Sequence, residues 1–249
     1  MKEFYIGSSG IKIHAKLDCP EGVEKAPLCI LIHGFTGHME EPHIIAAQKA
    51  MNDAGVCVLR AEMYGHGKSG GEFRDHTLFK WIENALSVLG YAESLGFVTD
   101  LYMCGHSQGG LLTMLIGGMC PDKFKAIIPL SPAWMIPGIT RSGEVLGQHF
   151  DPLHIPEKIL FGERELSGNY IRTAQLLHVE DAIAKFKRKV LIVHGDMDRT
   201  VPFSYAQKAA ELYADAQLVT VSGADHCFVG HTAEMASAVK EFFTKTEHI

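Results

Sequence analysis

Continuous apolar runs alternate along the chain with segments whose apolar residues follow helical spacing. Runs typical of strands occupy residues 28–34, 56–62, 101–105, 126–131, 189–195 and 217–223, and those at 28–34 and 56–62 are typical of strands buried on both faces. Helical spacing is found in residues 43–55, 78–96, 111–119, 204–216 and 232–245. Near the N-terminus, EFYI and IKIHAKL flank a glycine-containing turn and predict a β-hairpin. Strands that alternate with helices predict an α/β protein with a mainly parallel sheet.

One region interrupts this rhythm. The stretch between Pro132 and Lys189 is much longer than one crossover helix requires. Its first part is rich in glycine and proline, and it predicts a short hairpin around Gly162. Insertions of this length within a compact domain often carry function. We therefore expect a single domain over residues 1–249, with an inserted lid at about residues 133–176.

Composition narrows the function classes. The chain has 249 residues, of which 47% are hydrophobic and 21% charged, as in an ordinary globular protein. The net charge of -6 comes without a basic stripe or polybasic run, which argues against nucleic acid and membrane surfaces as partners. The N-terminal residues MKEFYIGSSG contain no signal-peptide core, so a cytoplasmic location is expected. A homodimer is compatible with the sequence, which does not determine the oligomeric state.

The six cysteines include no CxxC pair. Cys29, Cys57 and Cys104 lie within apolar strand-like runs, where a thiol packs as a small hydrophobic group. The expectation is that the cysteines are free thiols rather than disulfide-bonded.

The segment CGHSQGG, residues 104–110, follows a predicted strand and opens a predicted helix. G-x-S-x-G in that setting is typical of a nucleophile elbow, in which the strand and helix cross closely at the glycines. Ser107 would then be held in a strained backbone conformation with its hydroxyl accessible. The alternative is a serine that merely caps a helix. The strand–turn–helix context favours the nucleophile.

A serine hydroxyl needs a base to become a nucleophile. His226, in GADHCF, follows the last predicted strand and should lie at the same edge of the sheet as Ser107. Other histidines are less well placed: His106 adjoins the serine in sequence, His33 ends a strand, and His248 is in the terminal tail. We therefore predict that His226 is the base.

The base in turn needs a carboxylate that orients it. VHGDMDRTVP ends another predicted strand and offers Asp198, with Asp196 as the alternative. Asp225 adjoins His226 and is expected to shape its turn. The chain order of serine, aspartate and histidine is that of the α/β-hydrolase triad.

Two backbone amides are candidates for an oxyanion hole. The segment HGFTG follows the buried strand at 28–34, so the N–H of Phe35 can face the nucleophile, and the N–H of Gln108 lies next to Ser107. RAEMYGHGKSGG is also glycine-rich, but it lacks phosphate-loop spacing. The residues His33, His38, Glu40, Glu41 and His43 contain no HExxH motif. We therefore expect no metal and no cofactor.

The motifs HGFTG, GHGKSGG, CGHSQGG, VHGDMDRTVP and GADHCF occur in an order that resembles bacterial cinnamoyl (feruloyl) esterases, in particular the rumen-bacterial type. The resemblance implies an α/β-hydrolase fold with a mostly parallel eight-stranded sheet flanked by helices. It implies that Ser107, Asp198 and His226 form the triad and that the Phe35 and Gln108 amides form the oxyanion hole. Many relatives carry aspartate and asparagine where this chain has Glu62 and Tyr64.

The function implied by the resemblance is a serine carboxylesterase that hydrolyses hydroxycinnamate esters, of the kind found in plant cell walls, through an acyl-enzyme. The lid would cover the aromatic ring of the substrate, with Trp134 and Tyr170 as candidate contacts. Two enzymatic alternatives remain, a monoacylglycerol lipase and a general short-chain acyl esterase. A non-catalytic small-molecule receptor is a third alternative, because a fold does not determine function.

Overall fold

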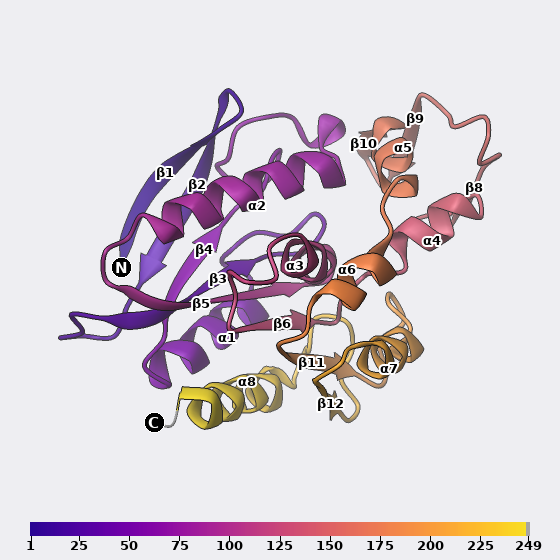
Figure 1. Cartoon of the computed structure of the whole chain (residues 1–249). Helices are drawn as coiled ribbons and strands as arrows, with labels where there is room; N and C mark the ends of the chain where they lie inside the picture. The colour runs from indigo at the N-terminus through magenta and orange to yellow at the C-terminus, as the bar shows by residue number, and fades with distance from the viewer. Residues whose placement is uncertain (248–249) are drawn as a thin grey trace.

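Eight strands form the central sheet, and the computed structural model describes residues 1–247 (Figure 1). The spatial order of the strands is β1-β2-β4-β3-β5-β6-β11-β12. Pairing is antiparallel from β1 to β4 and parallel from β4 to β12, which confirms the mostly parallel sheet. The strands are β1 (Lys2–Ser8), β2 (Ile11–Asp18), β3 (Ala26–Ile32), β4 (Cys57–Ala61), β5 (Val98–His106), β6 (Ala126–Leu130), β11 (Lys189–Gly195) and β12 (Ala216–Val221).

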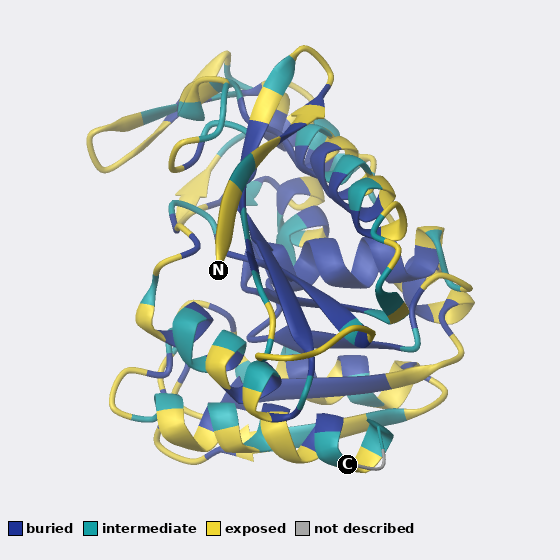
Figure 2. Ribbon diagram, turned by 90° about the vertical axis from the view of Figure 1, so that its left-hand side faces the viewer, coloured by how far each residue is buried: buried dark blue, intermediate teal, exposed yellow. Residues whose placement is uncertain are grey.

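Helices cover both faces of the sheet (Figure 1). Side chains of α1 (Pro42–Asp53) and α8 (Thr232–Glu247) share one buried cluster with the sheet. The cluster on the other face includes side chains of α2 (Leu78–Glu93), α3 (Gln108–Met119), α6 (Val179–Lys185) and α7 (Phe203–Leu212). A 3-10 turn, η1 (Phe73–Asp75), precedes α2. The sheet is therefore the buried middle layer, as the dark blue strands of Figure 2 show.

The two buried faces explain why the strands read as continuous apolar runs. In β3, Leu28, Ile30 and Ile32 pack into one cluster, whereas Cys29 and Leu31 pack into the other. A strand with solvent on one face would alternate apolar and polar residues instead.

Most of the long segment between β6 and β11 stands apart from the central sheet, whereas its last helix, α6, packs beside α3 on the sheet (Figure 1). Its residues 133–176, called the insertion below, contain two short hairpins and two helices. The predicted hairpin around Gly162 is present, because β9 pairs antiparallel with β10. The elements are α4 (Ile136–Arg141), β7 (Glu144–Val145), β8 (Gln148–His149), β9 (Lys158–Phe161), β10 (Arg164–Ser167) and α5 (Asn169–Gln175).

The expectation that all cysteines are free thiols was wrong for one pair. Cys19 follows β2, Cys57 begins β4, and the two are joined by a disulfide. The antiparallel register pairs Asp18 with Val58, so the next position along each strand brings the cysteines opposite one another. Spacing along the chain could not reveal this, because 38 residues separate the two.

The disulfide predicts how many cysteines react with a thiol reagent before and after reduction. Of six cysteines, four are free, so unfolded but unreduced protein should react with four equivalents of a thiol reagent, rising to six after reduction. Reduction should lower the free energy of unfolding by about 2–4 kcal/mol, because the closed loop restricts the unfolded chain. The double variant Cys19→Ser, Cys57→Ser should show the same loss and no response to reductant. Six reactive thiols before reduction would contradict the pairing.

Candidate active site

Ser107 occupies a strained turn between β5 and α3. Its φ of 56° lies in the left-handed region that residues with side chains rarely adopt. A Cβ on Gly105 would lie 2.2 Å from the Gly109 carbonyl oxygen, and one on Gly109 would lie 2.4 Å from that of His33. Only glycine therefore permits this approach of strand, helix and neighbouring loop. A hydrogen bond from the Ser107 N–H to the Leu130 carbonyl of β6 (2.9 Å) helps hold the turn.

The structure brings the three predicted triad residues together. His226 Nε2 lies 2.9 Å from Ser107 Oγ, and His226 Nδ1 lies 2.7 Å from Asp198 Oδ2. The other carboxylate oxygen, Oδ1, accepts the backbone N–H groups of Thr200 and Val201, each at 2.8 Å. Burial alone would raise the pKa of Asp198, but hydrogen bonds from His194 and His226 outweigh it and lower that pKa below its ordinary value. The carboxylate therefore stays ionised beside the imidazole.

The geometry distinguishes Asp198 from its neighbours. Asp196 accepts the N–H of Gly223 at 2.7 Å and lies at the surface. Asp225 accepts the N–H groups of Cys227 (3.1 Å) and Val229 (2.9 Å), which shapes the loop that carries His226. The His248 alternative lies outside the described residues.

His106 supports the loop that carries His226, a role the sequence did not suggest. Its ring is buried against that of His226, with centroids 4.8 Å apart, and its Nε2 donates to the His226 backbone carbonyl at 2.8 Å. On its other side it packs against His43, at 4.2 Å. Burial lowers the pKa of His106 well below its ordinary value, so the ring is a neutral support.

The two residues whose amides are the predicted oxyanion donors both line the cavity beside Ser107. Gln108 is the first residue of α3, and the first N–H groups of a helix have no acceptor within it. The helix thus begins three residues before the predicted residue 111. Phe35 lies in the loop after β3, which packs tightly here: a Cβ on Gly34 would come within 3.1 Å of Ser107 Cβ.

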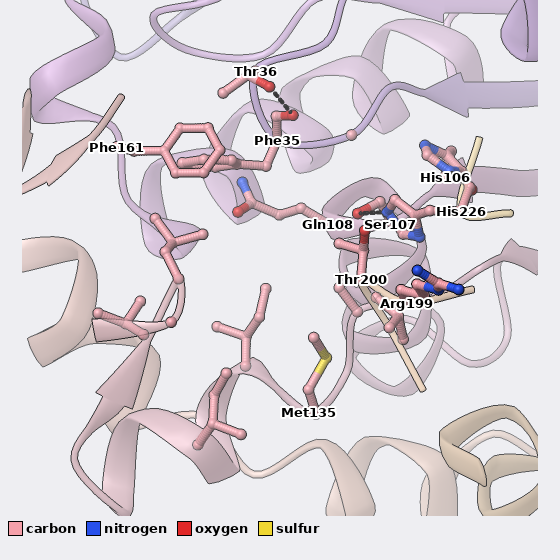
Figure 3. Close-up of a pocket in the computed structure, with 18 of the residues that line it drawn as sticks. Phe35, Thr36, His106, Ser107, Gln108, Met135, Phe161, Arg199, Thr200 and His226 are labelled. Carbon is pink, nitrogen blue, oxygen red and sulfur yellow. Dashed lines mark hydrogen bonds between the residues drawn. The ribbon is translucent and has the colours of Figure 1, made fainter. Parts of the chain in front are cut away.

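Neutral histidines brace the loop that carries Phe35. The N–H of Thr36, which has a φ of 61°, donates to His66 Nε2 at 3.2 Å, while His66 Nδ1 donates to the Tyr64 carbonyl at 2.9 Å. His33 Nδ1 donates to the Gly34 carbonyl at 2.7 Å. The Thr36 hydroxyl donates to the Phe35 carbonyl at 2.6 Å (Figure 3). These hydrogen bonds hold the loop of Phe35 in one conformation, as its predicted role in an oxyanion hole would require.

A cavity of about 660 Å³ opens beside Ser107, within the usual range for small-molecule sites. Figure 3 shows Ser107 and His226 on one side of it, Phe35 and Phe161 at one end, and Met135 at another. Polar side chains on its wall include Thr36, Glu41, Glu144, Arg199 and Thr200. The apolar wall supplied by the insertion comprises Met135, Ile136, Ile139, Val145, Leu146, Phe161 and Tyr170.

One end of the cavity is aromatic. The ring of Phe35 lies 5.4 Å from that of Phe161, edge to face, and 6.0 Å from that of Tyr170. Tyr170 lines the cavity as predicted, and its hydroxyl donates to Gln108 Oε1 at 2.7 Å. The insertion is therefore fastened to the turn that carries the nucleophile. Phe161 was not predicted from the sequence; its place at the tip of the hairpin around Gly162 was the available signal.

Trp134 requires a correction, because it is not among the residues that line this cavity. Its indole N–H donates to the Tyr205 carbonyl at 2.8 Å, and its ring packs edge-on against that of Tyr205. It borders a separate, smaller hollow between the insertion and α7. The indole is thus used in packing, and we propose no substrate contact for it.

Glu62 holds the loops around the cavity and does not line the cavity itself. Glu62, where many relatives carry aspartate, accepts the Lys68 N–H at 2.6 Å and pairs with His14 at 2.8 Å, outside the cavity.

Within residues 1–247, no group of three or more histidine, cysteine, aspartate or glutamate side chains has an arrangement suited to a metal ion. In the same part of the chain, no helix is long and apolar enough to cross a membrane.

Comparison with known proteins identifies the family. Residues 24–163, more than half of the chain, match the family model described as "Serine aminopeptidase, S33", and residues 169–248 match one described as "TAP-like protein". The chain belongs to the S33 family of α/β hydrolases. The α/β-hydrolase fold expected from the motifs is thereby confirmed.

Among solved structures, this α/β hydrolase is similar to Est1E from Butyrivibrio proteoclasticus with ferulic acid bound. The two are 52% identical with a TM-score of 0.97, over 99% of this chain and 100% of that one. A thermostable monoacylglycerol lipase from Bacillus sp. (strain H-257) is 28% identical over 81% of this chain and 80% of its own length. Human ABHD12B is 25% identical over 88% of this chain, which spans 61% of that protein.

The buried histidines make the stability of this α/β hydrolase depend on pH. Burial lowers the pKa of His33 and His76 to about 3 and that of His66 to about 4. In the unfolded chain these groups titrate near 6.5, so below that pH unfolding takes up protons. The stability that comes from keeping them neutral is complete above pH 6.5 and is lost as the pH falls toward 4.

We expect the free energy of unfolding to be lower by about 2 kcal/mol or more at pH 5 than at pH 7, measured by urea denaturation. His76→Gln should flatten this dependence, whereas His149→Gln, at an exposed position of the insertion, should not. Equal slopes for the two variants would refute the assignment.

Proposed function

We propose that this protein is a serine carboxylesterase that hydrolyses hydroxycinnamate esters such as those of ferulic acid. The observation that carries the proposal is the 52% identity, over essentially the whole chain, to a protein solved with ferulic acid bound. The cavity beside Ser107 supports it, because an apolar space with an aromatic end suits a planar phenylpropenoyl group.

The reaction would follow the route of other serine esterases. Ser107 Oγ attacks the ester carbonyl while His226 Nε2 takes its proton, and Asp198 stabilises the resulting imidazolium. The amides of Phe35 and Gln108 hold the developing oxyanion. His226 then protonates the leaving alcohol, and a water molecule repeats the sequence to release the acid. None of these steps needs a cofactor.

We further propose that the insertion acts as a lid over the acyl group and that Tyr170 belongs to the acyl-binding wall. Small feruloylated fragments of plant cell walls are the substrates that this arrangement suits. A cytoplasmic location stays a prediction. The Cys19–Cys57 disulfide weighs against it, since disulfides persist mainly in oxidising compartments.

A monoacylglycerol lipase is the second candidate function. The thermostable lipase noted above supports it, as does the aliphatic part of the cavity wall, which includes Ile136, Ile139 and Val145. Long-chain monoacylglycerols hydrolysed with a higher kcat/KM than methyl ferulate would favour this candidate. A short aliphatic ester in the same panel tests for a general acyl esterase.

Replacement of the nucleophile tests the mechanism. Ser107→Ala should lower kcat/KM for methyl ferulate by about 10⁴-fold or more, because no other group can form the acyl-enzyme. It should also abolish labelling by a fluorophosphonate probe, while circular dichroism remains unchanged. Ser237→Ala, at an exposed site on α8, is the matched control and should behave as wild type. Wild-type protein that resists the probe would instead indicate a non-catalytic receptor.

The aromatic end of the cavity can be tested separately. Phe161→Ala removes one ring from the proposed acyl site and should lower kcat/KM for methyl ferulate about tenfold, mainly through KM, because stacked aromatic contacts are lost. Hydrolysis of p-nitrophenyl acetate, whose acyl group cannot reach that end, should change less than about twofold. Phe79→Ala, on α2, removes an equally exposed ring away from the cavity and should leave both substrates unaffected. Equal losses on both substrates would contradict the proposal.

A further inference from the structure

A second imidazole lies behind the catalytic aspartate. His194 is in β11, within the apolar run KVLIVHG, and its side chain is fully buried. A buried imidazole costs stability unless its polar atoms find partners, and an aliphatic residue would suit this run better. The position of its ring atoms therefore calls for an explanation.

The ring contacts the triad directly. His194 Nε2 lies 3.0 Å from Asp198 Oδ2, and 3.0 Å from the backbone carbonyl oxygen of Val201. Both neighbours accept hydrogen bonds, so Nε2 must carry the proton that they share. His194 Nδ1 has no partner within the described chain, which is tolerable for a bare lone pair and far more costly for an N–H group. The contacts thus place a proton on Nε2 of His194.

Four N–H donors then lie within hydrogen-bond distance of the Asp198 carboxylate. Oδ1 accepts two backbone N–H groups, whereas Oδ2 accepts the N–H of His226 and lies 3.0 Å from His194 Nε2, whose proton also faces the Val201 carbonyl. The backbone bonds hold only one oxygen. Without His194, Asp198 Oδ2 would have His226 as its single partner. The ring of His226 must also accept and release a proton during each turnover.

We propose that His194 is a positioning residue of this esterase, which shares Asp198 Oδ2 with His226 and thereby sets both the orientation of the catalytic imidazole and the pH at which it acts. The proposal rests on the proposed function, because it needs Ser107, His226 and Asp198 to be the catalytic triad. It goes beyond that function by assigning a fourth side chain to the unit.

The effect on pH follows from the direction of the N–H dipole. Its positive end points at Oδ2 and so opposes the positive charge that His226 gains when it is protonated. Removal of the donor leaves Asp198 free to stabilise the imidazolium more strongly, and His226 then loses its basic form at a higher pH. The acidic limb of the kcat/KM profile should move upward.

Other titratable groups around His226 would be unchanged in such a variant. His106 packs on its ring, and Glu41 and His43 come from the start of α1. Asp225 and Cys227 flank it in its own loop, and Arg199 follows Asp198 at the cavity wall. A shift caused by His194 alone can therefore be recognised by comparison with wild type.

Two substitutions of similar size separate the hydrogen bond from mere packing. His194→Gln can return an N–H near the position of Nε2, whereas His194→Met fills the space without a donor. The kcat/KM profiles of both are measured with p-nitrophenyl acetate, whose hydrolysis does not depend on recognition of a hydroxycinnamoyl group. If the protein proved not to recognise ferulate esters, this experiment could therefore still be interpreted. If the wild-type protein hydrolysed neither p-nitrophenyl acetate nor methyl ferulate, that result would contradict the assignment of the triad rather than the role of His194.

For His194→Met we expect the acidic limb to rise by about 0.5 pH unit or more and kcat to fall about tenfold, with KM nearly unchanged. For His194→Gln the limb should stay within about 0.2 pH unit of wild type. A purely structural role would lower the melting temperature and leave the limb in place for both. Acidic limbs that coincide for the Gln and Met variants, shifted or not, would overturn the proposal.

One measurement on the wild-type protein avoids the risk that His194→Met fails to fold. Long-range ¹H–¹⁵N correlation spectra report which ring nitrogen of each histidine carries a proton. At the pH of the activity assays, Nε2 of His194 should carry a proton. A proton found on Nδ1 alone would remove the bond to Asp198 and with it the proposal.

Discussion

The close approach of β5, α3 and the loop after β3 is the constraint on which the site depends. Gly105 and Gly109 leave no space for a side chain, and the backbone of Ser107 is forced through a left-handed turn between them. The same crossing sets the first amide of α3 and the Phe35 loop beside the hydroxyl. One packing arrangement thus positions both the proposed nucleophile and the proposed oxyanion donors, and the buried strands around the turn hold its strained backbone in place.

Around this turn, neutral histidines hold loops in place through hydrogen bonds without adding charge to the interior. His33, His66 and His106 are buried, and each uses a ring nitrogen to donate to a backbone carbonyl of a loop that borders the site. A ring with one donor and one acceptor can bridge two backbone groups without bringing a charge into the interior. These three rings therefore bring hydrogen bonds but no charge to the surroundings of Ser107 and Asp198.

The sequence predicted much of this arrangement because the relevant signals are local. Ser107, Asp198 and His226 each follow a strand of the parallel part of the sheet, and parallel strands bring their carboxyl ends to one edge. The central strands and the hairpin around Gly162 were likewise readable from periodicity and turn residues. The Cys19–Cys57 disulfide was not, because it depends on which strands pair and in what register.

The sequence also failed to predict contacts between side chains that lie far apart along the chain. Trp134 and Phe161 are both aromatic residues of the insertion, and apart from the place of Phe161 at the tip of a hairpin, the sequence does not indicate which of them faces the cavity. His194 is similar: within the run KVLIVHG it looks like an interruption of a buried strand, and only the turn at residues 195–198 brings Asp198 back against its ring. Such pairings follow from how loops fold over strand ends, which no periodic pattern encodes.

The hydrogen bond from Tyr170 to Gln108 links two parts of the molecule with different freedom to change. Strand ends and glycines around the serine tolerate almost no alteration, while the walls contributed by the insertion are built from interchangeable apolar side chains. Over evolutionary time, such a division lets the range of accepted acyl groups drift in one segment while the bond-breaking chemistry is inherited intact in the other.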